Sequence, residues 1–379
     1  MKTVWDYIKT EKGIRILRMC GNDGRPAVPE EIDGCPVTEI GPYAFSAARL
    51  PRRFQVEPDQ VRHHVTGQSL FEETAESMNG SRLKEIRLPA SVTVIGDYGF
   101  YGCGNLEKIV FTDRLKRIGS GAFMGCSGVR KLEILESGTG SSSLYQMLSE
   151  LRYALEVRMV CGTKVRELVV PEYYEASVEN IPARILELHF QGTGYRYRQC
   201  FRGGTIAYRD YDELFRLAES QEPARVLAEL AYLRLKYPDE LSGDARTGYL
   251  NWFSAHVKEA GEYFLERDDV EAVRLIAEAG GFDGMEKLSG KSAGYTETRK
   301  EVADGAGDFY MASLGESVLG ETEAPEEEQL EPGVGQPRQA LEVLLEMAGR
   351  MGRTEMVGCL MDYRHRKAGG GKKKKTFDL

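Results

Sequence analysis

Two cysteines of this chain stand where a metal site could be built. Cys103 and Cys126 close the phrases GFYGC and GAFMGC, 23 residues apart. A structural zinc site takes four converging Cys, His, Asp or Glu ligands, yet no histidine lies near either cysteine in the sequence, and the seven cysteines contain no C-x-x-C pair. We therefore expect no metal site, and we interpret the two thiols as one buried structural position that occurs twice.

A glycine- and serine-rich loop at residues 134–148, ILESGTGSSSLYQML, is the nearest approach to a phosphate site. An anion could bind to the free N–H groups where such a loop enters a helix, but a P-loop ends in Gly-Lys-Ser/Thr and this loop has no lysine. The sequence GMEKLSGKS at residues 284–292 has that lysine, but five residues instead of four separate its two glycines. Neither segment predicts a nucleotide site, and we expect no cofactor.

The five histidines are scattered, and none accompanies a serine, cysteine or acid in a recognisable catalytic pattern. His189 falls at an outward position of an expected strand, which favours a place on a binding surface. We therefore predict a protein that is not an enzyme. An enzyme with its site in the C-terminal half of the chain is kept as an alternative.

Arginine alternates with tyrosine in residues 194–211, GYRYRQCFRGGTIAYRDY. Proteins that bind single-stranded nucleic acid combine basic and aromatic side chains in this way. The same alternation is also typical of a half-buried edge strand, and the net charge of −9 opposes attraction to a polyanion. We favour the edge strand and keep nucleic-acid binding through this segment as the second alternative.

A repeat of 23 residues would position these side chains. Leu83, Leu106 and Val129 recur at that spacing, as do Phe100 and Phe123. The shared phrase is L-x-x-I-x-apolar, followed after several residues by I-G-x-x-x-F-x-x-C. A period of about 20–29 residues is typical of a leucine-rich solenoid, in which each coil supplies a short strand and buries its apolar face against its neighbours. The two cysteines then stack in the core.

This phrase resembles the BspA-like leucine-rich repeat family. Upstream, residues 28–46 carry the entry pattern of that family, and residues 47–80 look like an insertion between two coils. Downstream, VRELVVP at residues 165–171 and ILELHF at residues 185–190 repeat the strand portion. The resemblance implies a β-solenoid over about residues 14–190, interrupted by a helix near residues 144–155. Residues 179–201 are also similar to a block of intracellular bacterial members.

The apolar spacing becomes helical from Tyr211 onward. Apolar residues recur at intervals of three and four, and helices are expected over residues 245–266 and 269–279, the second ending at a Gly-Gly pair. Residues 337–366 read as two helices with Gly352 at the turn and resemble the closing pair of an ankyrin-type unit. The expected fold class is α+β, a leucine-rich repeat β-solenoid followed by an ankyrin-like or α-solenoid helical region.

The expected organisation follows from these patterns and from composition. Residues 315–336 contain seven glutamates and no lysine or arginine, which is typical of a disordered acidic linker. In chain order the parts are the repeat solenoid (1–192, with its insertion at 47–80), a connector (193–215), the helical region (216–312), the acidic linker (313–337), a C-terminal helix pair (338–366) and a basic disordered tail (367–379).

Composition limits the partners and the compartment. The chain has 379 residues, with 50 basic and 59 acidic side chains, so nucleic acid and anionic lipid are not expected partners. No run approaches the ~18 apolar residues of a membrane helix, and charges interrupt every apolar run near the N-terminus, unlike a secretory signal. The odd set of seven cysteines favours a reducing compartment. We expect a cytoplasmic protein.

The predicted function is a non-enzymatic scaffold that binds another protein through its strand face. Inward positions are fixed by packing, whereas the outward positions differ between coils along a line of Arg87, Val110, Glu133, Val169 and His189. Mixed charges favour a protein partner over a polyanion. No oligomeric state follows from the sequence. The residues expected to contact the partner are Lys84, Glu85, Arg87, Glu107, Lys108, Val110, Arg130, Lys131, Glu133 and His189.

Overall fold

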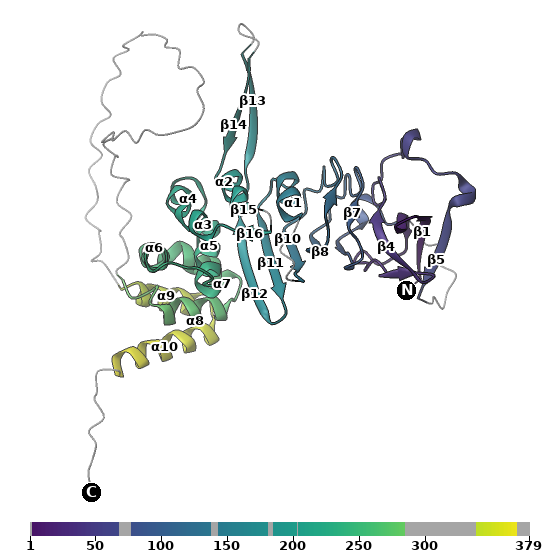
Figure 1. Ribbon diagram of the computed structural model, residues 1–379. Helices are drawn as coiled ribbons and strands as arrows, with labels where there is room; N and C mark the ends of the chain where they lie inside the picture. Colours follow the sequence, from purple (N-terminus) through teal and green to yellow (C-terminus); the bar gives the residue numbers. More distant parts are fainter. Residues whose placement is uncertain are drawn as a thin grey trace.

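The computed structural model describes residues 2–67, 77–137, 143–180, 185–202, 204–284 and 339–369, with the backbone alone for residues 175–190. An N-terminal sheet, a stack of parallel coils, a protruding two-stranded ribbon and a bundle of helices follow one another along the chain (Figure 1). The expected acidic linker at 313–337, residues 370–379 of the expected tail and most of the Gly/Ser loop lie outside the described residues. The tail prediction is wrong for residues 367–369, which continue the last helix, and Lys367 pairs with Asp283 at 2.5 Å.

The first residues form an antiparallel cap on the stack of coils. β1 (Thr3–Thr10) and β2 (Gly13–Cys20) make a hairpin, and β2 pairs in parallel with β4 (Cys35–Ile40). The expected insertion contributes β5 (Arg62–Thr66), which pairs antiparallel with the other side of β1. Trp5 is 1% exposed, so the cap closes the apolar end of the stack. Shorter elements are β3 (Glu31–Ile32) and the 3₁₀ turns Arg52–Phe54, Pro58–Gln60 and Gly80–Arg82.

Each coil contributes one strand to each of two sheets. One sheet has the strand order β12-β11-β10-β8-β6, and in the other β7 and β9 continue from β4. Equivalent strands of successive coils pair in parallel, which confirms that the 23-residue period marks stacked coils. The strands of the coils are β6 (Glu85–Arg87), β7 (Val94–Ile95), β8 (Lys108–Thr112), β9 (Arg117–Ile118) and β10 (Lys131–Leu135).

A ladder of phenylalanines fills the centre of the coils. The rings of Phe45, Phe100 and Phe123 stack with centroid separations of 5.0 and 5.3 Å and interplanar angles of 4° and 5°. Beside them the Cys103 thiol donates to the Phe45 carbonyl at 3.3 Å, and the Cys126 thiol donates to the Phe100 carbonyl at 3.1 Å. Both cysteines are buried. Their equivalent contacts confirm that they are one structural position in successive coils.

The parallel stack ends earlier than the sequence predicted. β11 (Leu155–Cys161) is parallel to β10, but β12 (Lys164–Val170) returns antiparallel to β11. β13 (Tyr174–Asn180) and β14 (Ile185–Gln191) then form an antiparallel sheet of their own. The prediction of further parallel coils at 165–171 and 185–190 is therefore wrong. A parallel crossover needs a dozen or more residues, and the links between these strands are too short.

Residues 194–211 do not form the predicted edge strand. They contain α2 (Gly194–Gln199), the two short strands β15 (Phe201–Arg202) and β16 (Thr205–Ile206), and the start of α3 (Tyr208–Glu213). Three of the four tyrosines are buried: Tyr197, Tyr208 and Tyr211. Buried rings cannot stack on bases, so the geometry does not support the nucleic-acid platform that the alternation suggested.

Arg198 of this segment is a structural side chain. It is 2% exposed, and its guanidinium lies 4.8 Å from the ring centre of Tyr173. Desolvation by burial lowers the pKa of Arg198 to about 10. The guanidinium joins the end of α1 (Leu144–Glu150) to the neighbouring strands and to α2. The carbonyls that it contacts belong to Leu148, Leu151, Tyr153, Pro171 and Gly194.

The C-terminal half is a bundle of helices. The expected helix over 245–266 is broken at His256 into two helices, whereas the expected helix over 269–279 and the turn at Gly352 are confirmed. The final pair packs on the bundle, since a Cβ on Gly261 would meet the Leu344 side chain at 2.7 Å. The helices are α4 (Phe215–Gln221), α5 (Ala224–Lys236), α6 (Gly243–Ala255), α7 (Val257–Glu266), α8 (Val270–Ala279), α9 (Ala340–Arg350) and α10 (Thr354–Gly369).

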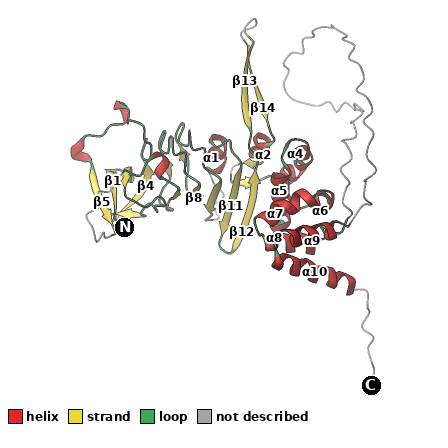
Figure 2. Cartoon of the chain, turned by 180° about the vertical axis from the view of Figure 1, so that it is seen from behind, coloured by secondary structure: helices red, strands yellow, loops and turns green. Residues whose placement is uncertain are grey.

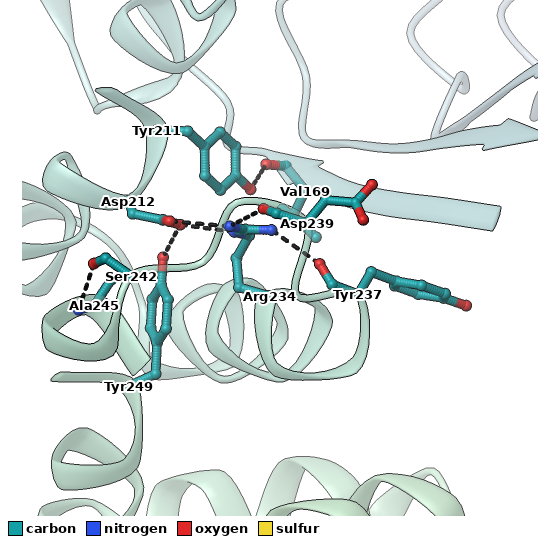
Figure 3. A network of polar contacts seen from close by, with 9 residues as sticks. All are labelled: Val169, Tyr211, Asp212, Arg234, Tyr237, Asp239, Ser242, Ala245 and Tyr249. Carbon is teal, nitrogen blue, oxygen red and sulfur yellow. Dashed lines mark hydrogen bonds and ion pairs between the residues drawn. The ribbon is translucent and has the colours of Figure 1, made fainter. Parts of the chain in front are cut away.

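A buried polar network ties the helices to the strands (Figure 3). Arg234 of α5, which is 0% exposed, donates to both carboxylate oxygens of Asp212 at 2.7 and 3.0 Å. Tyr249 of α6 donates to the same carboxylate at 2.7 Å. The Tyr211 hydroxyl donates to the Val169 carbonyl of β12 at 2.6 Å. This network fixes α5 against the last strand of the coil sheet.

Candidate binding surface

The strand register places most of the predicted partner-binding residues in two rows. Glu85, Lys108 and Lys131 pair across β6, β8 and β10 in one row. Arg87, Val110 and Glu133 pair in the row two positions further on. The intervening row of Ile86, Ile109 and Leu132 is 0% exposed. The three inward aliphatic side chains are therefore confirmed as core residues, and all the residues of the two outward rows except Val110 keep contact with solvent.

Three members of the predicted outward line need correction. Val110 is fully buried, because it lies in register between the long side chains of Arg87 and Glu133 on the adjacent strands. Val169 is 4% exposed and aligns with Glu156, since β12 runs antiparallel to β11. His189 lies on β14 of the ribbon and takes no part in the coil sheet.

The three residues that immediately precede the coil strands are exposed. Lys84 and Glu107 lie at the surface ahead of β6 and β8. Arg130 precedes β10 and donates to the carbonyls of Ser127 and Val129, at 2.8 Å in each case. Its guanidinium lies 5.2 Å from the ring centre of Tyr153. These side chains extend the charged surface toward the start of the strands.

The helical bundle completes this surface and turns it into a groove. A cavity of about 570 Å³ lies between the outward side of β8, β10, β11 and β12 and the helical residues that face it. Lys108, Lys131 and Glu133 line its strand wall. The network around Arg234 sets the position of the α5 part of the opposite wall, because Arg234 belongs to the same helix as Glu229, Tyr232 and Lys236. The polar residues from the helical side are Glu229, Tyr232, Lys236, Arg267, Asp269 and Glu271.

Charges of both signs alternate across the groove and pair with one another. Lys108 and Glu133 approach to 2.8 Å, and Lys131 and Glu156 approach to 2.6 Å. Arg158 pairs with Glu167 on the hairpin, and Lys236 pairs with Glu271 between α5 and α8 at 3.2 Å. These pairs lie at the surface with partly exposed side chains, and surface ion pairs contribute only about 0–1 kcal/mol to stability. A bound partner can therefore replace either member at little cost.

Glu229 is a half-buried acid on the α5 wall of the groove. Desolvation by burial raises its pKa, and the Tyr263 hydroxyl, which donates to it at 2.8 Å, opposes that rise. Arg267 in turn donates to the Tyr263 hydroxyl at 2.9 Å. A carboxylate held in this way is suited to accept a hydrogen bond from a partner, because a further donor offsets its lost hydration.

The helical wall and β11 were not predicted as parts of the site. β11 could have been found, because Leu155, Val157 and Met159 alternate as a half-buried strand requires. It was missed because its inward Val157 follows Leu132 by 25 residues instead of 23. The helical wall carries no comparable signal, since nothing in the spacing of Glu229 or Lys236 indicates which strand they face.

Two of the scattered histidines, His63 and His256, make contacts with neighbouring side chains of the fold. His63 lies 2.7 Å from Asp6 at the surface of the cap, and His256 stacks on Trp252 with ring centres 4.9 Å apart. Within the part of the chain that the structure describes, no three His, Cys, Asp or Glu side chains gather as metal ligands would. In the same residues no helix has the length and apolar character needed to cross a bilayer.

A family model agrees with the repeat that the stacked coils display. Residues 38–149 match the BspA type leucine rich repeat region in six copies. Among solved structures, a leucine rich cell surface protein from Faecalibacterium prausnitzii A2-165 is 18% identical, with a TM-score of 0.24 over 41% of each chain. A leucine rich repeat protein of T. pallidum is 19% identical, with a TM-score of 0.19 over 38% of this chain and 76% of that one. The chain thus matches less than half of the first. No curated protein matches it significantly.

Proposed function

We propose that this chain is a protein-interaction module without catalytic activity, and that it binds another protein in the groove between its leucine-rich repeat strands and its helices. The observation that carries this proposal is that two halves with different architectures contribute side chains to one groove. Leucine-rich repeat stacks provide extended binding surfaces of this kind.

The lining of the groove favours a protein ligand. Basic and acidic side chains alternate within it, so it can match a polar protein surface but gives no uniform field for a polyanion. The exposed residues ahead of the strands, Lys84, Glu107 and Arg130, extend the contact surface beyond the groove. A standard interface of ~800 Å² per partner needs an extension of this kind.

The test exchanges one ion pair of the groove. A partner is first recovered by affinity purification from the native host with mass spectrometry, and its affinity is then measured with purified proteins. Lys131→Glu breaks the pair with Glu156 and should weaken binding about tenfold, since it places like charges together and removes a basic contact. The double variant Lys131→Glu, Glu156→Lys restores the internal pair with inverted polarity.

Binding should stay weak in the double variant, because the partner meets reversed charges although the pair inside the protein is intact. Arg209→Glu is the matched control, as its side chain is 90% exposed on α3 and pairs with Glu213 away from the groove. If the double variant regains full affinity, the single variant acted through the fold. Full affinity in all three variants would exclude the groove as the binding site.

We also propose a cytoplasmic location. The support is chemical: all seven cysteines are free thiols in the structure, a state that persists in reducing compartments. Cell fractionation with a tagged chain tests this, and recovery of the protein in a surface or extracellular fraction would contradict it.

A further inference from the structure

The groove between the strands and the helices holds one negative charge in excess. Its strand wall and its helical wall meet where α5 lies beside β12, as both views show (Figures 1 and 2). Six of the side chains that line the groove are acidic and five are basic. The charges of the lining therefore do not cancel, and the position of the excess acid indicates what the groove can bind.

The excess acid is Glu229. The four ion pairs of the groove use four of the basic side chains and four of the acids. The fifth basic side chain, Arg267, lies over the ring of Tyr263, 5.1 Å from its centre. Of the two acids that remain, Asp269 caps α8, since its carboxylate accepts the Ala272 N–H at 2.9 Å. Among the described residues, Glu229 has neither an ion pair nor a helix end to offset its charge.

The surroundings of Glu229 leave one of its oxygens open. The Tyr263 hydroxyl donates to Oε2 at 2.8 Å, and within the part of the chain that the structure describes no donor reaches Oε1. Burial raises the pKa of Glu229, and the negative charge of Glu156 on the opposite wall adds to that rise. The ammonium of Lys131 is already 2.6 Å from the Glu156 carboxylate. One lysine of the strand wall thus faces two carboxylates, one from each wall.

The two carboxylates favour a cation over a neutral ligand group. A carboxylate that loses hydration without gaining a cation is unfavourable to bury. A neutral donor could reach the open oxygen of Glu229, but Glu229 and Glu156 would still repel each other. A cation satisfies the oxygen and offsets both charges, and a charged donor makes a hydrogen bond about twice as strong as a neutral one. An acidic group would meet like charges at this place.

We propose that the protein bound in the groove inserts a basic side chain, arginine or lysine, between Glu229 of α5 and Glu156 of β11. This inference rests on the proposed function, because it concerns the same groove, and it adds the chemistry of the central contact. The inserted cation pairs with the open oxygen of Glu229, while Lys131 keeps its contact with Glu156. Glu229 then selects partners by the sign of the charge that they present.

The experiment measures the affinity of variants of the full chain for the purified partner protein that is recovered for the Lys131→Glu test. Glu229→Gln removes the charge and keeps an oxygen for the Tyr263 hydroxyl, and it should weaken binding at least about tenfold. Tyr263→Phe removes that hydrogen bond and keeps the charge, so it should weaken binding by at most about threefold. Glu213→Gln is the matched control, because this acid is 66% exposed and pairs with Arg209 away from the groove. Circular dichroism verifies that each variant is folded.

A charge exchange with the partner identifies the inserted side chain. Glu229→Lys places a cation where the partner's cation should lie, so its binding should be weaker than that of Glu229→Gln. The exposed arginines and lysines of the partner are then replaced by glutamate one at a time. One of these replacements should weaken binding to the unmodified chain and strengthen binding to Glu229→Lys at least about tenfold. Its identity shows whether the inserted group is a guanidinium or an ammonium.

The outcomes separate this inference from the proposed function. Full affinity in Glu229→Gln, together with a loss in Lys131→Glu, would overturn the inserted cation and leave the groove as the binding site. Full affinity in both variants would overturn both proposals. Tighter binding by Glu229→Gln would show that the partner presents an acid. Equal losses in Glu229→Gln and Tyr263→Phe, or a partner in which no replacement strengthens binding to Glu229→Lys, would mean that Glu229 only holds the helical wall in place, and the inference would be wrong.

Discussion

The coil half and the helical half of this molecule bury polar groups in different ways. In the coils, the buried donors are backbone N–H groups and thiols, and the contact of Cys103 with Phe45 recurs between Cys126 and Phe100. In the helical half, the central buried donor is the guanidinium of Arg234, which donates to one carboxylate and to two carbonyls in an arrangement that occurs once. In the coils, many equivalent contacts each contribute part of the stability, whereas in the helical half much of it depends on the one network around Arg234.

The two tryptophans allow this difference to be measured separately in each half. Trp5 is buried in the N-terminal cap and Trp252 is buried in α6, and the chain has no other tryptophan. Trp252→Phe leaves a reporter for the coils, and Trp5→Phe leaves a reporter for the helices. For each stability prediction below, the substitution is made in both single-tryptophan variants, and urea unfolding is followed by tryptophan fluorescence.

The largest effect is expected at the last ring of the phenylalanine ladder. Phe123→Ala removes a ring that is 1% exposed and stacked on Phe100, so it should lower the free energy of unfolding by ~3–5 kcal/mol. The loss should appear first in the Trp5 signal, because neighbouring coils depend on the same stack. Phe123→Leu, which keeps most of the volume, is the matched control. A loss below about 1 kcal/mol in Phe123→Ala would contradict the ladder.

A loss of similar size is expected in the helical half, through a different mechanism. Arg234→Met leaves the Asp212 carboxylate buried without its cation, which costs ~3–5 kcal/mol. The loss should appear in the Trp252 signal. Replacing both partners, with Arg234→Met and Asp212→Leu, should recover much of the loss, since no buried charge remains.

No recovery in that double variant would show that the pair matters less than the two backbone contacts of Arg234. The guanidinium also donates to the carbonyls of Tyr237 and Asp239, at 2.9 Å in each case. Those acceptors lose their donor in both variants. The difference in free energy of unfolding between the single and double variants therefore separates the contribution of the ion pair with Asp212 from that of the two carbonyl contacts.

The same difference explains what could be predicted from the sequence. Repetition made the coils visible, because Phe100 and Phe123, Cys103 and Cys126 recur at one spacing and equivalent residues must stack. The strand rows through Lys108 and Lys131 followed directly. The end of the parallel stack was not predicted. The segment around Val169 has the strand composition of a coil, but a hairpin turn joins it to the preceding strand. Composition records burial and alternation, and it does not record strand direction.

The helical wall of the groove was beyond prediction for a related reason. Lys236 and Glu229 are ordinary helix surface residues in the sequence, and only the docking of α5 on β12 makes them face Lys131. Arg198 was misread for the opposite reason. Its alternation with tyrosine indicated a strand, but six contacts to backbone carbonyls, which no spacing encodes, hold it inside a helix. A contact that occurs once between distant segments produces no repeated spacing in the sequence.

The smallest effect tests how the ladder of coils is closed. Desolvation by burial raises the pKa of Glu150, against the opposing effect of the N–H groups of Phe123 and Gly121. The folded protein therefore binds a proton more readily than the unfolded chain does, and stability falls as pH rises from the usual carboxyl value through the raised folded value.

Glu150→Gln keeps an acceptor for Phe123 and removes this titration. It should be more stable than the unmodified chain at pH 7 by about 0.5 kcal/mol or less, since Glu150 is only half buried and solvent screens it. The difference should vanish near pH 4, when urea unfolding is followed through Trp5. Glu107→Gln, an exposed change of the same charge in the same stack, is the control.

Glu150→Leu, which removes the acceptor, should instead cost about 1–3 kcal/mol at every pH. An equal cost for Gln and Leu would mean that the carboxylate does not close the ladder.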